Sequence, residues 1–283
     1  MQKPLAVVLA CSFALAAVPA AEAQLELPRP SPKATVMQQV GLTEISIAYS
    51  SPGVKGRPIW GSLVPYGEVW RTGANEATTI TFSTDAMVAG KAVPAGTYGL
   101  FTLPGEKEWM VILNKGAKQW GAYEYKAEED LFRFPVTPQA APFAERMTFS
   151  FADTTFDSTV VTFSWEKLRI TFPVSVDTQG RTLAAARTAI AAAKADDWRT
   201  PLRAANYCLD ANVNLEEART WVAKSLAVQE TMNGLLAKAR FAALDGKKAE
   251  AIALAEKAIA VARKADPKAD VSPAERYLAD WRK

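Results

Sequence analysis

Apolar and polar residues alternate along much of the chain between residues 35 and 175. Alternation over short stretches is typical of strands that bury one face. The pattern predicts eight or nine short strands, at 35–40, 43–49, 78–83, 87–93 (interrupted at Gly90-Lys91), 98–103, 109–113, 147–151, 161–165 and 168–172. Short, closely spaced strands of this kind indicate an antiparallel β-sandwich or a jelly-roll-like barrel.

The connections in this region are of three kinds. Residues 104–107 (Pro-Gly-Glu-Lys) predict a hairpin with a four- or five-residue loop. Glu166-Lys167 separates two alternating runs and predicts a two-residue turn. Residues 50–77 follow no strand rhythm, and loops of that length in a compact domain usually have a function or contain some structure of their own.

A helical period replaces the alternation near residues 177–180, where we place a domain boundary. Helices are expected at 181–194, 199–212, 215–229, 233–245 and 248–264. A last helix is expected from Ser272, which with Pro273 and Glu275 has the residue types of an N-cap, an N1 proline and a capping-box acid.

Part of the helical pattern repeats after 33 residues. Ala218, Trp221 and Ser225 are followed at this interval by Ala251, Leu254 and Ala258. The spacing resembles the tetratricopeptide repeat, although Leu235 stands where that repeat has a large aromatic residue. A short array of helix pairs would present a groove to a peptide or protein partner. A plain helical bundle packed on the sandwich is the alternative, because alanine favours any helix.

The first 23 residues have the features of a secretory signal peptide. A basic start is followed by an apolar run at 5–18 and by Ala21-Glu22-Ala23, which predicts cleavage before Gln24. We therefore expect export to the periplasm or the medium, with lipidation of Cys11 as the alternative. A proline-rich lead-in at 24–34, a β-sandwich domain at 35–178 and a helical domain at 179–283 would follow, with no further segment apolar enough to cross a membrane.

The chain contains 33 basic and 30 acidic side chains and no histidine. The absence of histidine excludes Ser-His-Asp and Cys-His catalysis and imidazole metal ligands. Cys208 would be the one cysteine of the mature chain, and its helical surroundings indicate a small buried residue. We expect no metal and no cofactor. Nucleic acid is not an expected partner either, because basic and acidic residues alternate along the helices.

The densest polar and aromatic segments are residues 49–60 (YSSPGVKGRPIW) and 65–76 (PYGEVWRTGANE). They resemble the hallmarks of a family of exported bacterial proteins catalogued as domain of unknown function 2911. Residues 94–101 and Asn114, Trp120 and Gly121 fit the same family, and the resemblance extends over about residues 28–174. It implies a β-rich fold and export, and it implies no activity.

These segments supply the candidate ligand-binding residues. Their side chains are planar guanidiniums that suit carboxylate or phosphate, polar groups that position them, and aromatic faces for a sugar or apolar ligand: Arg57, Trp60, Tyr66, Trp70, Arg71, Asn75, Glu76 and Trp120. The alternative is structural. In that interpretation Arg71 and Glu76 form an internal ion pair, and the tryptophans close one end of the sandwich.

Three functions are consistent with this sequence. The first is a non-catalytic module of the cell envelope that binds a small molecule or glycan at 50–77, or a protein partner. The second is a hydrolase acting on glycan or another envelope substrate through Glu68 and Glu76. The third is a structural envelope protein.

Residues 128–130 (Glu-Glu-Asp) lack the alternating oxygen ligands of a calcium site and predict a solvated turn.

Overall fold

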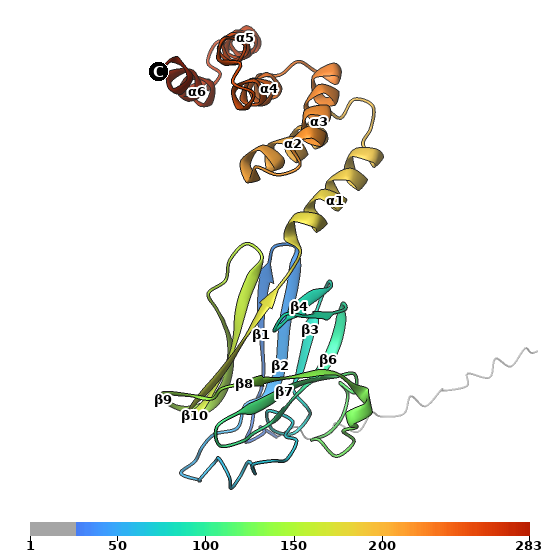
Figure 1. Ribbon diagram of the computed structural model, residues 1–283, viewed down its shortest axis with the longest axis vertical. Helices are drawn as coiled ribbons and strands as arrows, with labels where there is room; N and C mark the ends of the chain where they lie inside the picture. The colour runs from blue at the N-terminus through green and yellow to red at the C-terminus, as the bar shows by residue number, and fades with distance from the viewer. Residues whose placement is uncertain (1–26) are drawn as a thin grey trace, which may run out of the picture.

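The computed structural model describes residues 27–283, so the predicted signal peptide, its cleavage site and Cys11 lie outside the described residues. In the described range, ten strands between residues 33 and 175 precede six α-helices (Figure 1). The prediction of an antiparallel sandwich followed by an all-α region of helix hairpins is confirmed. None of the helices in residues 27–283 has the length and apolarity that a membrane crossing requires.

The strands form two antiparallel sheets. The larger sheet has the order β1-β2-β3-β6-β7-β8 and consists of β1 (Lys33–Val40), β2 (Thr43–Ser50), β3 (Thr79–Phe82), β6 (Gly96–Leu103), β7 (Trp109–Asn114) and β8 (Asp130–Val136). The smaller sheet has the order β5-β4-β10-β9 and consists of β5 (Lys91–Val93), β4 (Ala86–Val88), β10 (Ser158–Ser175) and β9 (Gln139–Ala152).

One hydrophobic core lies between the two sheets. Ile45 and Ile47 of β2 and Phe163 and Trp165 of β10 contribute to it, and each is at most 1% exposed. Full burial of an aliphatic or phenylalanine side chain of this size contributes roughly 1.5–3 kcal/mol. The alternation seen in the sequence therefore separates an inner, buried face of each sheet from an outer face.

The predicted turn at Glu166-Lys167 is wrong. β10 continues through these residues as one strand of 18 residues. Glu166 has a φ of 57°, and the pairing with β9 shifts register on both sides of it, so it forms a β-bulge. A bulge inserts one residue, which explains why inward positions are odd-numbered up to Trp165 and even-numbered from Ile170.

The sequence predicted no strand between residues 114 and 146, where the structure has β8 and the first part of β9.

The prediction of a solvated turn at 128–130 is wrong for Asp130, whose side chain is only 9% exposed. Its carboxylate accepts hydrogen bonds from Tyr125, Arg133 and Asn114. Burial and this carboxylate raise the pKa of Tyr125 to about 12. The network ties the segment 115–129 to the edge of the larger sheet.

The helical region comprises α1 (Thr178–Ala192), α2 (Arg199–Ala211), α3 (Leu215–Val228), α4 (Met232–Leu244), α5 (Lys248–Ala265) and α6 (Ser272–Arg282). Cys208 is fully buried in it, as predicted, and this burial raises the pKa of its thiol. The prediction of Ser272 as the N-cap of the last helix is wrong. Val271 takes that position, and the Asp270 carboxylate accepts a hydrogen bond from the Ser272 N–H.

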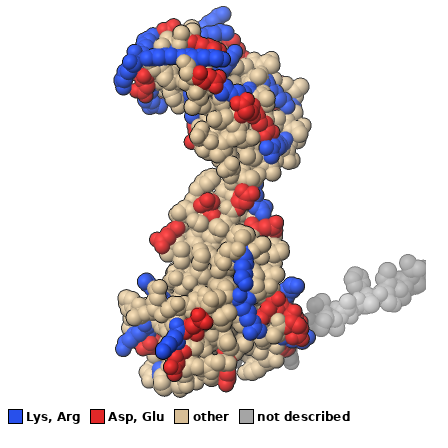
Figure 2. All heavy atoms as spheres, viewed as in Figure 1, with Lys and Arg blue, Asp and Glu red and all other residues tan. Residues whose placement is uncertain are grey.

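The two regions meet where α1 begins, and Figure 2 shows a narrow waist there. The Thr178 hydroxyl donates to the Phe156 carbonyl at 3.0 Å, and the Thr178 side chain lies against Gly41. A Cβ on Gly41 would stand 2.0 Å from the Thr178 Oγ1 atom. Arg181 of α1 also forms an ion pair with Asp85 at 3.6 Å.

We predict that Gly41→Ala destabilises the protein by about 1–3 kcal/mol, because alanine meets both an unfavourable positive φ and the Thr178 side chain. Gly90→Ala is the matched control, since Gly90 has a φ of 76° but no atom within 4 Å of the point where an alanine Cβ would lie. Urea unfolding of the two variants measures the difference. Equal losses of stability would show that the contact with Thr178 contributes nothing.

Candidate functional site

The two central tryptophans of the candidate segment, Trp60 and Trp70, are partly buried and pack against the sandwich core. The Trp70 ring stacks on Trp165, with ring centroids 5.9 Å apart and 17° between the planes. Trp60 packs edge-on against Trp109 at 4.9 Å and 65°. The indole N–H groups of Trp60, Trp109 and Trp165 are buried without a hydrogen-bond acceptor among the described residues. Trp60 and Trp70 thus contribute to packing between the two sheets, whereas Trp120 is 54% exposed.

Arg57 and Tyr66 interact within their own loops. The Arg57 guanidinium donates to the carbonyls of Gly53 and Val54, at 2.6 and 3.1 Å. The Tyr66 ring lies against Gly61, where a Cβ would stand 2.8 Å from a ring carbon. Neither side chain converges with the other candidates on a common ligand position.

Glu76 lies at the centre of an ion-pair cluster on the outer face of the larger sheet. Its carboxylate accepts hydrogen bonds from Arg29 at 2.8 and 3.0 Å, and the Lys33 ammonium lies at 3.2 Å. The hydrogen bond from Arg29 is the largest of several effects that lower the pKa of Glu76 from 4.5 to about 2. The predicted ion pair between Arg71 and Glu76 is therefore wrong, because Glu76 pairs with Arg29 and Lys33.

Asn75 and Trp120 lie beside this cluster. The Gly121 N–H donates to the Asn75 carbonyl, and the Asn75 side-chain amide donates to the Ser31 carbonyl at 3.2 Å. The Arg29 guanidinium carbon lies 6.0 Å from the centre of the Trp120 ring, which is 54% exposed. Three of the eight candidates, Asn75, Glu76 and Trp120, are thus brought together, and the proline-rich lead-in is held against them.

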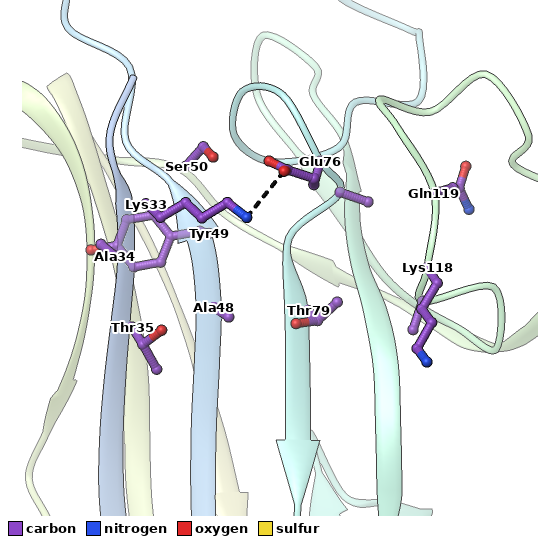
Figure 3. A pocket seen from close by; sticks show the side chains of 12 residues that line it. Lys33, Ala34, Thr35, Ala48, Tyr49, Ser50, Glu76, Thr79, Lys118 and Gln119 are labelled. Carbon is purple, nitrogen blue, oxygen red and sulfur yellow. Dashed lines mark ion pairs between the residues drawn. The ribbon is translucent and has the colours of Figure 1, made fainter. Parts of the chain in front are cut away.

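A pocket of about 500 Å³ opens next to Glu76 (Figure 3). Its floor is a row of small side chains, Thr35, Ala48 and Thr79, which are direct neighbours across β1, β2 and β3. The whole lining is Lys33, Ala34, Thr35, Ala48, Tyr49, Ser50, Glu76, Ala77, Thr79, Ala117, Lys118 and Gln119. Small side chains on adjacent strands leave a hollow, and the segment 117–119 raises one wall of it.

Only Glu76 of the eight predicted residues lines this pocket. The alternating pattern identifies Thr35, Ala48 and Thr79 as outward-facing residues, but it does not reveal that they are neighbours. Lys118 belongs to a loop, and no sequence pattern indicates that it approaches β3. The lining of the pocket is mostly apolar. At its rim Lys33 and Lys118 outnumber the single carboxylate of Glu76, which is also bound by Arg29 from outside the lining, so the rim has an excess of positive charge.

The chemistry of this site suits binding better than proton transfer. A carboxyl group with a pKa of about 2 is ionised at neutral pH, so Glu76 has no proton to donate. Glu68, its proposed partner in hydrolysis, is exposed and does not line the pocket. Among residues 27–283 there is also no cluster of acidic and cysteine side chains that would hold a metal ion.

The structure defines a two-part protein, a two-sheet antiparallel sandwich with an outer-face pocket and a helical extension. Residues 31–174 match the family described as protein of unknown function DUF2911, and the chain belongs to this family. The helical region lies outside the match. No curated protein and no solved structure matched the chain.

We predict that Glu76→Gln reduces the loss of stability in acid. The folded state has the lower pKa, so the ionised carboxylate stabilises it fully above about pH 4.5, and this contribution is lost as the pH falls toward 2. The side chain is 38% exposed, so solvent screening limits the effect to about 1 kcal/mol or less. Thermal unfolding at intervals between these pH values measures it.

Glu68→Gln is the matched control, because Glu68 is exposed and has no ion-pair partner in residues 27–283. Its pH dependence should equal that of the wild type. If Glu76→Gln also behaves like the wild type, the ion pairs with Arg29 and Lys33 do not stabilise the fold.

Proposed function

We propose that this is an exported cell-envelope protein, periplasmic or secreted, that binds a small ligand without chemical conversion. The observation that carries this proposal is the pocket above Thr35, Ala48 and Thr79, whose floor lies on paired strands and is therefore rigid. A preformed, mostly apolar hollow with a few charged groups at its rim is the usual form of a small-molecule site.

The rim indicates the chemistry of the ligand. The Lys33 ammonium already forms an ion pair with Glu76, whereas the Lys118 ammonium has no carboxylate partner in the described part of the chain. A ligand with an apolar body and a negative group would cover the small side chains of the floor and place its charge near Lys118. Acidic sugars and carboxylates with a short apolar body have this character.

A hydrolase is less well supported, because Glu76 is fixed as a carboxylate by two cations and Glu68 is not part of the pocket. A purely structural role explains Trp60, Trp70 and Arg57, which serve the fold. It does not explain the hollow, since larger side chains at Ala48 or Thr79 would fill it without disturbing the inner face of the sheet.

We propose a second binding surface on the helical region, for a peptide or protein partner. The starts of α2 and α4 lie 33 residues apart, and so do those of α3 and α5, which agrees with a tetratricopeptide-like array. Ala218 and Ala251 occupy equivalent, fully buried positions in α3 and α5. α2, α4 and α6 share a hollow of about 350 Å³, lined by Leu209, Arg240, Ala243, Leu244, Tyr277 and Trp281.

We predict that Ala48→Leu abolishes ligand binding in the outer-face pocket while the protein stays folded. Ala48 is exposed on the outer face, so the larger side chain fills the pocket without entering the core. The measurement is the change in melting temperature across a panel of organic acids, acidic sugars and neutral sugars. A ligand at 100 times its dissociation constant would stabilise the wild type by about 2.7 kcal/mol.

Ser46→Leu is the control, because Ser46 lies two residues earlier on the same face of β2 and outside the pocket. It should respond to the ligand like the wild type. A ligand that stabilises the wild type and Ala48→Leu equally would place its site elsewhere.

For the helical surface, we predict that Leu244→Asp abolishes the binding of peptides selected from a displayed random library. Leu244 is the last residue of α4 and lines the hollow, although it is 56% exposed. Val228→Asp is the control, since Val228 is the last residue of α3, is 39% exposed and lies outside the hollow. Peptides that bind both variants as well as the wild type would contradict this proposal.

A further inference from the structure

Arg71 is placed on the outer face of the larger sheet by the strand-like pairing of its neighbour. Trp70 pairs with Thr102 of β6, and both face the core. Because successive residues in an extended chain point to opposite faces, the next side chain, Arg71, points outward. The charge of Tyr123, which is 83% exposed, raises the pKa of Arg71 and partly opposes the effect of burial.

The Arg71 guanidinium lacks the partners that the other arginines have. Six arginines lie between residues 27 and 176, and the other five each donate a side-chain hydrogen bond: Arg29 to Glu76, Arg57 to Gly53 and Val54, Arg133 to Asp130, Arg146 to Pro30 and Ser51, and Arg169 to Gln139. The Arg71 side chain donates none to another described residue. Its Nε–H group is buried without an acceptor.

A half-buried cation without a counter-charge is costly, because it has lost water and gained no partner. This burial lowers the pKa of Arg71, and the charge of Tyr123 only partly opposes the effect. The guanidinium stays charged at neutral pH all the same. The uncompensated charge is therefore a property of the folded protein.

The backbone beside Arg71 holds this arrangement in place. Thr72 has a φ of 52°, a conformation that is strongly disfavoured for a β-branched residue. The Thr78 N–H donates to the Arg71 carbonyl at 3.2 Å, and the Thr78 hydroxyl donates to the Thr72 carbonyl at 2.7 Å. The Thr72 side chain is also hydrogen-bonded to Thr102. Backbone strain that several hydrogen bonds hold in place is typical of residues at binding sites.

We propose that Arg71 is a preorganised binding site for an oxyanion, the carboxylate or phosphate group of a small ligand. The guanidinium is a planar fork of donors that matches both groups in two-point contacts. An anion that contacts the terminal amino groups of the guanidinium supplies the counter-charge that the described residues do not. This site is separate from the outer-face pocket, since Arg71 does not line that pocket.

The test uses the whole chain labelled with ¹⁵N in its arginines, titrated with acetate and with inorganic phosphate at constant ionic strength. We expect one Nε–H resonance to shift in a saturable way, and Arg71→Lys identifies it by its disappearance. The tighter of the two anions distinguishes a carboxylate ligand from a phosphate ligand. In Arg71→Lys the dissociation constant, followed by thermal shift, should rise about tenfold or more because the fork is lost.

Arg57→Lys is the matched control, because the Arg57 guanidinium is already bonded to carbonyls, and it should bind the anion like the wild type. Arg71→Met should raise the melting temperature without anion, since it removes a desolvated charge. A guanidinium that only braces the loop would instead lose stability on this change.

The proposal is overturned if all arginine resonances drift without saturation, or if Arg71→Met binds the anions like the wild type. Ala48→Leu should leave the response of Arg71 intact, so failure of this site and failure of the pocket are distinguishable.

Discussion

The packing of Trp60 and Trp70 against Trp109 and Trp165 determines where the rest of the candidate segment lies. Each indole buries on the order of 150–250 Å² when it enters a core, and at roughly 25 cal/mol per Å² this outweighs any single surface contact in the segment. A stretch without regular secondary structure is thereby fixed to both sheets. The polar residues between and after the tryptophans have little freedom left.

The consequence of this packing is a division of roles along one short segment. Side chains that face inward, such as Trp70, build the fold. Arg71 and Glu76 face outward instead, and both lie on the outer face of the larger sheet. There they differ, because Glu76 is neutralised by Arg29 and Lys33, whereas Arg71 has no counter-charge in the described residues. Binding capacity is therefore expected where the charge is left unmatched and where small side chains leave a hollow.

Much of the fold is predictable from the sequence, because alternation and helical periodicity report directly which faces are buried. A change in the phase of the alternation is ambiguous, however. It marks a turn or a bulge, and at Glu166 the structure has the bulge. Alternation at Phe132 and Phe134 is short and is followed by Pro135, so it gave too weak a signal to identify β8.

The candidate site is less predictable, because it depends on contacts between distant residues. The residue type alone indicates that Glu76 forms ion pairs. Its partners Arg29 and Lys33 cannot be predicted without knowing where the proline-rich lead-in lies. For the tryptophans, sequence did not distinguish a binding face from a core position, since both need the same flat apolar side chain. Lys118 depends on the path of a loop that local rules do not define.

Residues 51–78 are an integral part of the sandwich rather than a flexible binding loop. Native-state hydrogen exchange of four amides tests it most directly, namely those of Val54, Gly67, Trp70 and Ala77, which donate to Glu145, Pro104, Thr102 and Gln119. We expect these four amides to exchange with the same free energy of opening as the amides of β2 and β6. Rapid exchange of these four amides while β2 and β6 stay protected would contradict it.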